Sequence, residues 1–235
     1  MKTIGIIGGM SWESSKFYYK YINKIVAKRL GGSHSARILM SSVDFAEIET
    51  LSFEDNWNKI GELMAIEAKK LETAGADVVI LATNTIHLVA QYIEDAISIP
   101  FLHIAQATGE AIKQNGVQKI ALLGTRFTME KNFYTGILTN EFGFEVLIPS
   151  EEERNYLQNL IYGELVKGKF TQEGKEKCLH IIESLKTKGV EGVILGCTEL
   201  PILIPEDEIS MASFDTTMIH SLAAVDFAIA QTRNI

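Results

Sequence analysis

The same strand-and-turn pattern occurs twice in this chain, and it constrains the fold more than any other feature. The first copy, ADVVILATNTIHLV, runs from Ala76 to Val89, and the second, VEGVILGCTELPIL, runs from Val190 to Leu203. In each copy a short apolar run gives way abruptly to polar residues, which predicts a buried strand that ends in a polar turn. Matching residues keep a constant separation, so Thr83 of the first copy corresponds to Cys197 of the second.

A second pair of segments repeats in the same order. IGIIGGM around Gly8 resembles IALLGTR around Gly124, at nearly the same separation, and two ordered matches favour a duplicated fold. Short apolar runs also alternate with longer amphipathic ones, which is typical of α/β proteins with parallel sheets. We therefore predict two pseudo-symmetric, Rossmann-like α/β domains with the active site in the cleft between them. The first is expected at 1–104 plus 212–235, and the second at 105–211.

The expected elements follow from the same alternation of short and long segments. Strands are predicted at Thr3–Gly8, Ala36–Val43, Asp77–Ala82, Pro100–Ile104, Lys119–Gly124, Phe144–Pro149, Gly192–Gly196 and Ile209–Asp215. Helices are predicted at Trp12–Leu30, Glu54–Thr73, Ala105–Gln114, Glu151–Val166, Gln172–Lys186 and Thr216–Thr232.

Composition excludes several classes of protein. The chain has 235 residues, of which 46% are hydrophobic, so it can bury a substantial core. No apolar run reaches the length of a membrane span, and the N-terminal apolar run is too short for a signal peptide. A net charge of −8 argues against partners such as nucleic acid or an anionic membrane. With only two cysteines there is no disulfide framework, so we expect a cytoplasmic protein.

The turns after the strands are the expected binding positions, because ligands of open parallel sheets bind at the carboxyl ends of the strands. These turns are Gly8–Trp12, Thr83–Thr85, Gly124–Arg126 and Gly196–Glu199. Each leads toward a predicted helix, whose first N–H groups suit an anion such as a small carboxylic acid. The GIIGGM segment does not match the dinucleotide-binding glycine pattern, and the histidines lack the spacing of a metal site.

Cys197 is the best candidate for a reactive side chain. It ends a predicted buried strand and comes shortly before a predicted helix, a setting that lowers the pKa of a thiol. The other cysteine, Cys178, lies within the apolar pattern of a predicted helix, and we interpret it as structural.

At these positions the sequence resembles the aspartate/glutamate racemase family. The resemblance rests on IGIIGGM at the N-terminus, Thr83-Asn84-Thr85-Ile86-His87 in the first half, Gly196-Cys197-Thr198-Glu199 in the second, and the late FDTT at 214–217. GGMSWES, LGGSHSA and SVDF are most similar to its broad-specificity amino-acid racemase branch. The resemblance implies a two-domain enzyme that inverts the Cα centre of an amino acid without pyridoxal phosphate (PLP) or another cofactor, and commonly a homodimer.

The family reaction uses one acid–base group on each face of the substrate. By resemblance, Cys197 would remove the α-proton of the L-isomer. The first-half motif usually has cysteine where this chain has Thr83, and a hydroxyl is a much weaker acid than a thiol. Thr83 is therefore either a proton relay, with His87 as a possible partner one turn later, or only a substrate-binding hydroxyl.

The remaining site positions carry over from the family motifs. The residues expected to bind the amino acid are Met10, Ser11, Asn84, Thr85, Thr125, Lys167, Thr198 and Glu199. Within this set, Glu199 would pair with the substrate ammonium. Lys167 would meet a side-chain carboxylate, with Arg126 as a rival for that role. Aspartate, glutamate and a neutral amino acid all remain open as substrates.

Two other functions fit the same residues. With a single thiol, the site could protonate one face of an enediolate, as in the related arylmalonate decarboxylases. The chain could also be a non-catalytic amino-acid-binding protein that has lost its first base. Racemisation through Cys197 and Thr83 is the leading prediction.

Overall fold

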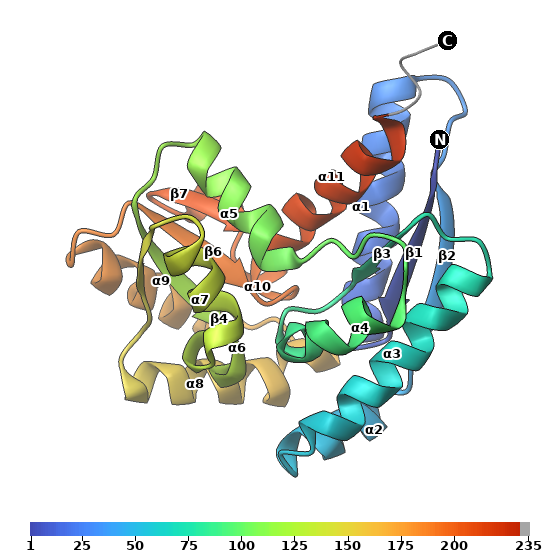
Figure 1. Ribbon diagram of the computed structural model, residues 1–235. Helices are drawn as coiled ribbons and strands as arrows, with labels where there is room; N and C mark the ends of the chain where they lie inside the picture. Colours follow the sequence, from blue (N-terminus) through green and yellow to red (C-terminus); the bar gives the residue numbers. More distant parts are fainter. Residues whose placement is uncertain (231–235) are drawn as a thin grey trace. The chain divides into compact units, whose positions relative to one another are not determined.

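The computed structural model describes residues 1–230, which fall into two compact units (Figure 1). Unit 1 comprises Met1–Ile104 and the described part of Thr217–Ile235, and unit 2 comprises Ala105–Thr216. The predicted boundary at residue 212 is therefore misplaced. The segment that follows it, Ala212–Asp215, is a strand of the unit 2 sheet, and the chain returns to unit 1 only after that strand has paired.

Unit 1 is built on a parallel sheet of three strands. The strands are β1 (Thr3–Gly8), β2 (Arg37–Ser42) and β3 (Val78–Leu81), in the order β2-β1-β3. The predicted strand Pro100–Ile104 is reduced to a single parallel bridge between Phe101 and Val79. Pro100 has no N–H to donate, and the next helix already begins at Ile104, so too little extended chain remains for a strand.

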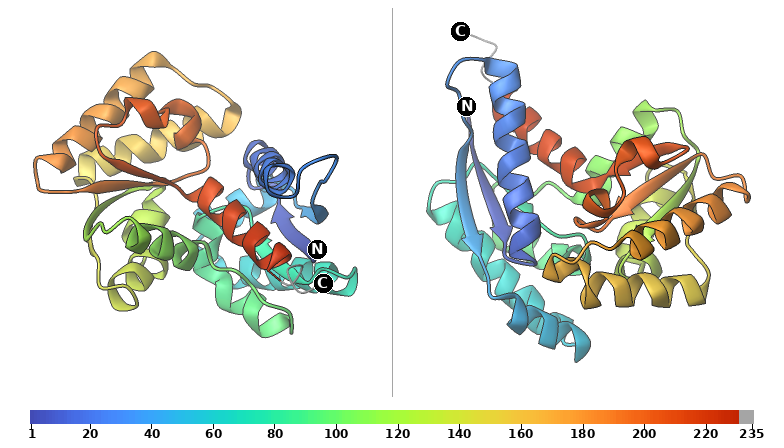
Figure 2. Two further views of the ribbon diagram at one scale, coloured as in Figure 1. Left: turned by 90° about the horizontal axis from the view of Figure 1, so that it is seen from above. Right: turned by 180° about the vertical axis from the view of Figure 1, so that it is seen from behind.

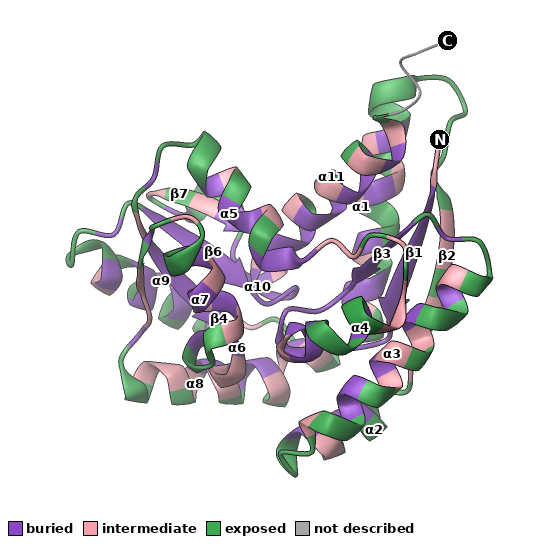
Figure 3. Cartoon of the chain, viewed as in Figure 1, coloured by how far each residue is buried: buried purple, intermediate pink, exposed green. Residues whose placement is uncertain are grey.

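Helices cover both faces of this sheet (Figure 2). Helix α1 (Trp12–Leu30) and helix α11 (Thr216–Ile229) pack on one face, against Ile4 and Ile6 of β1. Helices α2 (Phe45–Phe53), α3 (Trp57–Thr73) and α4 (Ala90–Ala96) pack on the other, against Ile7 of β1. Because successive strand residues point to opposite faces, a strand covered on both sides is apolar throughout. Figure 3 shows β1 and β3 buried between partly exposed helices.

Unit 2 repeats this plan with one more full strand. Its strands β4 (Lys119–Gly124), β5 (Glu145–Leu147), β6 (Gly192–Gly196) and β7 (Ala212–Asp215) are parallel, in the order β5-β4-β6-β7. The order matches β2-β1-β3 followed by the Phe101 bridge, so the prediction of two similar parallel-sheet α/β domains is confirmed. The helices of this part of the chain are α5 (Ile104–Gln114), α6 (Arg126–Glu130), α7 (Asn132–Asn140), α8 (Glu151–Gly163), α9 (Gln172–Lys186) and α10 (Leu200–Leu203).

Most differences from the predicted elements are short helices. No bounds were predicted for the 3-10 helices η1 (Thr85–Val89), η2 (Leu165–Lys167) and η3 (Glu206–Glu208), or for α2, α4, α6, α7 and α10. Helices were expected to follow the polar turns at which η1, α6 and α10 begin. The helix predicted from Glu54 begins at Trp57, because the Asn56 side chain caps it by accepting the Lys59 N–H. The helix predicted to Thr232 is described to Ile229, and Gln231 and Thr232 lie outside the described residues. Over residues 1–230, no helix combines the length and apolarity required to cross a bilayer.

Candidate functional site

In unit 1, the turns after β1 and β3 lie at the same edge of the sheet, because the two strands are parallel and paired as far as Ile7 and Leu81. Ser11 caps α1 at this edge, where its side chain accepts the Ser14 N–H. The Ser14 hydroxyl lies 2.8 Å from the Ser11 carbonyl oxygen and 3.4 Å from that of Ala82. Ser14 therefore links the Met10–Ser11 turn to the residue immediately before Thr83.

The close approach of the turn after β1 to β2 depends on Gly9. Its φ is +98°, and a Cβ at this position would lie 2.2 Å from the Val43 carbonyl oxygen. The Val43 N–H donates to the Gly8 carbonyl oxygen, which holds the end of β2 against the same turn. Gly9 of IGIIGGM thus permits a tight turn beside Met10 and Ser11.

The second turn of unit 1 carries Thr83, Asn84 and Thr85, and all three are buried. Within the described residues the Thr83 hydroxyl makes no hydrogen bond, so it is available to a ligand. The carbonyl oxygen of Thr83 lies 2.8 Å from Nδ1 of His87. His87 therefore contacts the backbone of Thr83 and not its hydroxyl, which contradicts the predicted relay between the two side chains.

In unit 2, Thr125 and Cys197 follow neighbouring strands at the same level. Gly124 pairs with Gly196 at the last register position of β4 and β6. A Cβ on Gly124 would lie 2.8 Å from the Gly196 carbonyl oxygen, so the two strands approach closely because neither residue has a side chain. Thr125 caps α6, where its hydroxyl oxygen accepts the N–H of Thr128 at 3.2 Å.

Cys197 is held by the carboxylate of Glu199. The thiol lies 3.1 Å from Oε2 of Glu199, and the Thr198 hydroxyl donates to the same oxygen at 2.6 Å. All three residues are buried, and Glu199 is only 2% exposed. The thiol is therefore a donor to a carboxylate that could accept its proton.

The prediction that the local setting lowers the pKa of Cys197 is wrong. Burial, followed by the charge of Glu199, raises the pKa of this thiol well above its usual value. The backbone N–H groups of Glu199 and Leu200 act in the opposite direction but do not prevail. The expected helix contributes little, since α10 begins only at Leu200 and has four residues.

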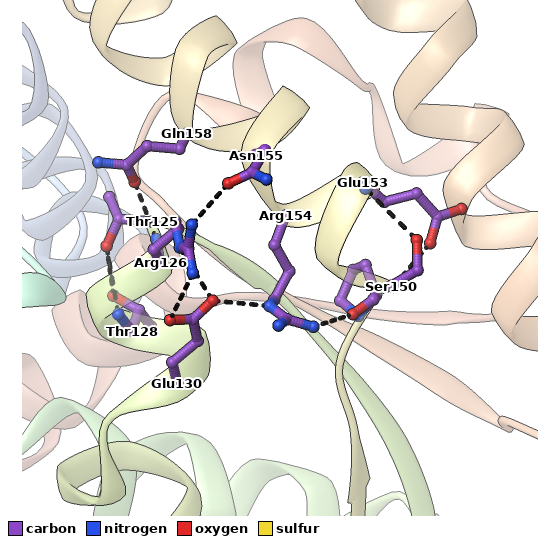
Figure 4. A network of polar contacts seen from close by, with 10 residues as sticks. Thr125, Arg126, Thr128, Glu130, Ser150, Glu153, Arg154, Asn155 and Gln158 are labelled. Carbon is purple, nitrogen blue, oxygen red and sulfur yellow. Dashed lines mark hydrogen bonds and ion pairs between the residues drawn. The ribbon is translucent and has the colours of Figure 1, made fainter.

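Arg126 and Lys167 were the two rivals for a substrate side-chain carboxylate. The Arg126 guanidinium is already bound to Glu130, with Nε at 2.9 Å, and to Asn155 at 2.6 Å (Figure 4). Glu130 also accepts from Arg154 at 2.7 Å, so Arg126 belongs to a surface network. Lys167 is exposed at the end of η2 and makes no ion pair among the described residues. Of the two cations, Lys167 is the one available to a ligand.

Sequence reasoning missed the contact between Glu199 and the Cys197 thiol, because no spacing rule specifies that Glu199 turns back toward the sulfur. It also missed a cluster of buried histidines in unit 1, formed by His87, His103 and His220. The ring centroids of His87 and His103 lie 4.6 Å apart, and those of His87 and His220 lie 5.8 Å apart. Their separation along the chain hid this cluster, since His220 reaches it only through the return of α11 to unit 1.

The structure groups the predicted site residues by unit. Met10, Ser11, Thr83, Asn84 and Thr85 lie at the sheet edge of unit 1, and Thr125, Cys197, Thr198 and Glu199 at that of unit 2. Chemically, unit 2 offers a thiol next to a carboxylate, and unit 1 offers an unbonded hydroxyl with neighbouring polar groups. Such groups can accept, donate and hold protons.

Comparison with known proteins gives a consistent result. The family model described as Asp/Glu/Hydantoin racemase matches residues 7–225. A crystal structure of a Yersinia pestis protein assigned to the Asp/Glu racemases is 46% identical. It aligns over 97% of this chain and 100% of that one, with a TM-score of 0.91.

Two curated relatives match over shorter stretches. The glutamate racemase of Leptospira borgpetersenii is 33% identical over 147 residues, which are 62% of this chain and 54% of that protein. The broad-specificity amino-acid racemase RacX of Bacillus subtilis is 36% identical over 80 residues, 34% of each chain. The chain thus spans about half the length of the first curated relatives that it matches.

Proposed function

Because the chain belongs to the Asp/Glu/Hydantoin racemase family, we propose that it racemises an amino acid at Cα without PLP or another cofactor. The observation that carries the proposal is the thiol of Cys197, which lies 3.1 Å from the Glu199 carboxylate at the end of β6. A cofactor-independent racemase needs such a base, since the α-proton must be removed by a protein group.

In the proposed reaction, Glu199 accepts the thiol proton of Cys197. The resulting thiolate removes the α-proton of the L-isomer, and the thiol is formed again. This route is compatible with the raised pKa of Cys197, because the thiolate has to form only when a substrate is bound. Backbone N–H groups and hydroxyls at the two sheet edges would bind the α-carboxylate as it gains enediolate character.

Thr83 is proposed to donate its hydroxyl proton to the other face of Cα and so to form the D-isomer. The Thr83 oxygen then takes a proton back from water, and Glu199 releases to water the proton that it accepted from Cys197. Its hydroxyl makes no hydrogen bond within the described residues, which supports a role toward the substrate. Asn84, Thr85, Met10, Ser11, Thr125 and Thr198 are proposed to bind the amino-acid backbone. The reaction would thus draw one acid–base group from each of the two similar units.

An acidic amino acid, aspartate or glutamate, is the substrate that we propose to test first. Lys167 is an exposed cation without an ion pair among the described residues, so it is available to a side-chain carboxylate. The names of the glutamate racemase and broad-specificity relatives are consistent with this choice and with a wider range. We further propose a cytoplasmic homodimer, for which Trp12 and Tyr19 of α1 offer exposed aromatic surface.

The proposal is tested with purified protein, without PLP, by chiral chromatography of L- and D-amino acids. We expect the wild type to form the opposite enantiomer of aspartate or glutamate, and Cys197→Ala to abolish this turnover. Cys178→Ala is the matched control. Cys178 is buried in α9, where burial raises its pKa to about 12, so its removal should leave turnover intact. Binding of an amino acid without turnover by the wild type would instead indicate a binding protein.

A further inference from the structure

The tautomer of His87 is fixed by its two backbone contacts. Nε2 lies 3.2 Å from the backbone nitrogen of Ile104, whose N–H can only donate, so Nε2 must be the unprotonated acceptor. The proton is then on Nδ1, 2.8 Å from the carbonyl oxygen of Thr83, which can only accept. The ring is thus neutral, with each nitrogen bonded to a different segment of backbone.

One of these two segments carries a residue of the proposed reaction, and the other begins a helix. Thr83 carries the proposed proton-donating hydroxyl. Ile104 is the first residue of α5, and the chain passes from unit 1 to unit 2 immediately after it. The first N–H groups of a helix have no partner within the helix, and His87 satisfies one of them. A single imidazole therefore ties the Thr83 turn to the start of α5.

The surroundings of His87 favour the neutral ring. Burial, followed by the neighbouring His103 and His220, lowers the pKa of His87 well below its usual value. His220 is itself held by two contacts. Its Nε2–H donates to the Leu102 carbonyl oxygen at 2.8 Å, and its Nδ1 accepts from the Tyr18 hydroxyl at 3.0 Å. The cluster around His87 thus contains His103, His220 and Tyr18.

We propose that His87 is a positioning residue. By donating from Nδ1 to the Thr83 carbonyl, it fixes the turn so that the Thr83 hydroxyl stays directed to the substrate. This inference rests on the proposed racemisation, because it assigns His87 a role in the step that Thr83 performs. It goes beyond that proposal by predicting which half of the reaction His87 controls. Loss of His87 should impair delivery of a proton by Thr83 while leaving removal of the α-proton by Cys197 in place.

Two amide substitutions separate the contacts of His87. An Asn amide can place its NH₂ near the Nδ1 position, so His87→Asn can keep the bond to Thr83. A Gln amide reaches the Nε2 position, so His87→Gln can keep the bond to Ile104 and loses the one to Thr83. His220→Gln is the matched control, because it alters a buried histidine of the same cluster that does not contact Thr83.

The readout is the ratio of D-isomer formed to Cα–H exchanged when the L-substrate is incubated in D₂O. We expect His87→Gln to lower this ratio by at least about tenfold, since small misplacements of a catalytic group cost this much or more. His87→Asn should restore most of the ratio, and His220→Gln should leave it unchanged. A general loss of folded protein lowers exchange and inversion together, so it leaves the ratio unaffected.

Nitrogen NMR of the full chain tests the geometry independently of turnover. It should show one neutral imidazole protonated on Nδ1 that disappears in His87→Gln. An unchanged ratio in His87→Gln, with the wild type active, would overturn the positioning role, and so would a signal from the Nε2–H tautomer at His87. A wild type that neither exchanges nor inverts any amino acid would instead refute the proposed racemisation itself.

Discussion

Glu199 has two opposing effects on Cys197. Its charge raises the pKa of the thiol, after the larger effect of burial, and its carboxylate is also the nearest acceptor for the thiol proton. A residue that only maintained a reactive thiolate would be cationic, as in activated cysteines beside Lys, Arg or His. In the proposed reaction the thiol therefore stays protonated until a substrate is bound and Glu199 accepts its proton.

We predict that the substitution Glu199→Gln increases the thiolate fraction of Cys197 but decreases racemisation. Glu199→Gln removes the charge that raises the Cys197 pKa, so that pKa should fall, although burial keeps it above the usual value. Racemisation should nevertheless decrease by about 10²-fold, because an amide cannot accept the thiol proton. Ultraviolet titration of the thiolate in a Cys178→Ala background measures the first effect, and chiral chromatography the second. Equal or greater turnover by Glu199→Gln would remove Glu199 from the proposed proton path.

The identity of the site residues was largely predictable from the sequence, but their contacts were not. The position of Cys197 at a strand end followed from the apolar run before it. Its raised pKa depends on Glu199 turning back toward the sulfur, which no spacing rule specifies. His87 was noticed four residues after Thr83, but its partner Ile104 lies in another segment, so the contact could not be inferred from local sequence.

At the scale of elements, the long helices and most strands were predictable because their apolar periodicity is strong. β1, β4, β6, α1 and α9 have the predicted limits. The limits of the short helices after strand ends were not predicted, since helices of four to nine residues carry little periodicity. The prediction of a strand at Pro100–Ile104 was wrong, because this segment is apolar like a strand but ends where α5 begins.

The close approach of β4 and β6 at their ends gives a prediction about stability. Gly124→Ala would place a Cβ 2.8 Å from the Gly196 carbonyl oxygen, where backbone must move. We expect the free energy of unfolding to fall by about 1–3 kcal/mol, the usual cost of overpacking, and turnover to fall with it, because Thr125 and Cys197 follow these strands.

Gly163→Ala is the matched control for this measurement. Gly163 ends α8, and an added Cβ would meet no atom within 4 Å. Urea unfolding of the two variants compares the same chemical change at a crowded and an open position. A Gly124→Ala protein as stable as Gly163→Ala would show that the strand ends are not tightly packed.

At the scale of the whole molecule, the buried histidines connect stability to pH. Burial lowers the pKa of both His103 and His220 from 6.5 to about 4. Between these values the unfolded chain binds more protons than the folded one, so stability is full above about pH 6.5 and decreases as the pH falls toward about 4. Each histidine contributes up to ~1.4 kcal/mol per pH unit within this window.

Urea unfolding in the upper part of that window, above the range in which carboxylates titrate, measures this dependence. His220→Gln should reduce the slope by up to ~1.4 kcal/mol per pH unit, since one titrating group is lost. A substitution at His34, which is exposed, is the control and should leave the slope unchanged. Stability that is independent of pH across the window would contradict the burial of neutral histidines in unit 1.

The central claim is that each unit supplies one acid–base group, a thiol in one unit and a hydroxyl in the other. The duplicated fold explains why two corresponding positions carry these groups. The repeat predicted the two units, and the matching strand orders confirm them. Spacing does not predict whether the hydroxyl that replaces a thiol in one copy transfers a proton, because both groups fit the same turn. Only the reaction distinguishes a relay from a binding hydroxyl.

The most direct test incubates an L-substrate in D₂O with the wild type and with Thr83→Val, following Cα–H loss and D-isomer together. Valine removes the hydroxyl but keeps the size of the side chain, and the hydroxyl has no hydrogen bond within the described residues to lose. The account predicts that the wild type exchanges and inverts, whereas Thr83→Val still exchanges the L-isomer but forms almost no D-isomer. Undiminished inversion by Thr83→Val would contradict it.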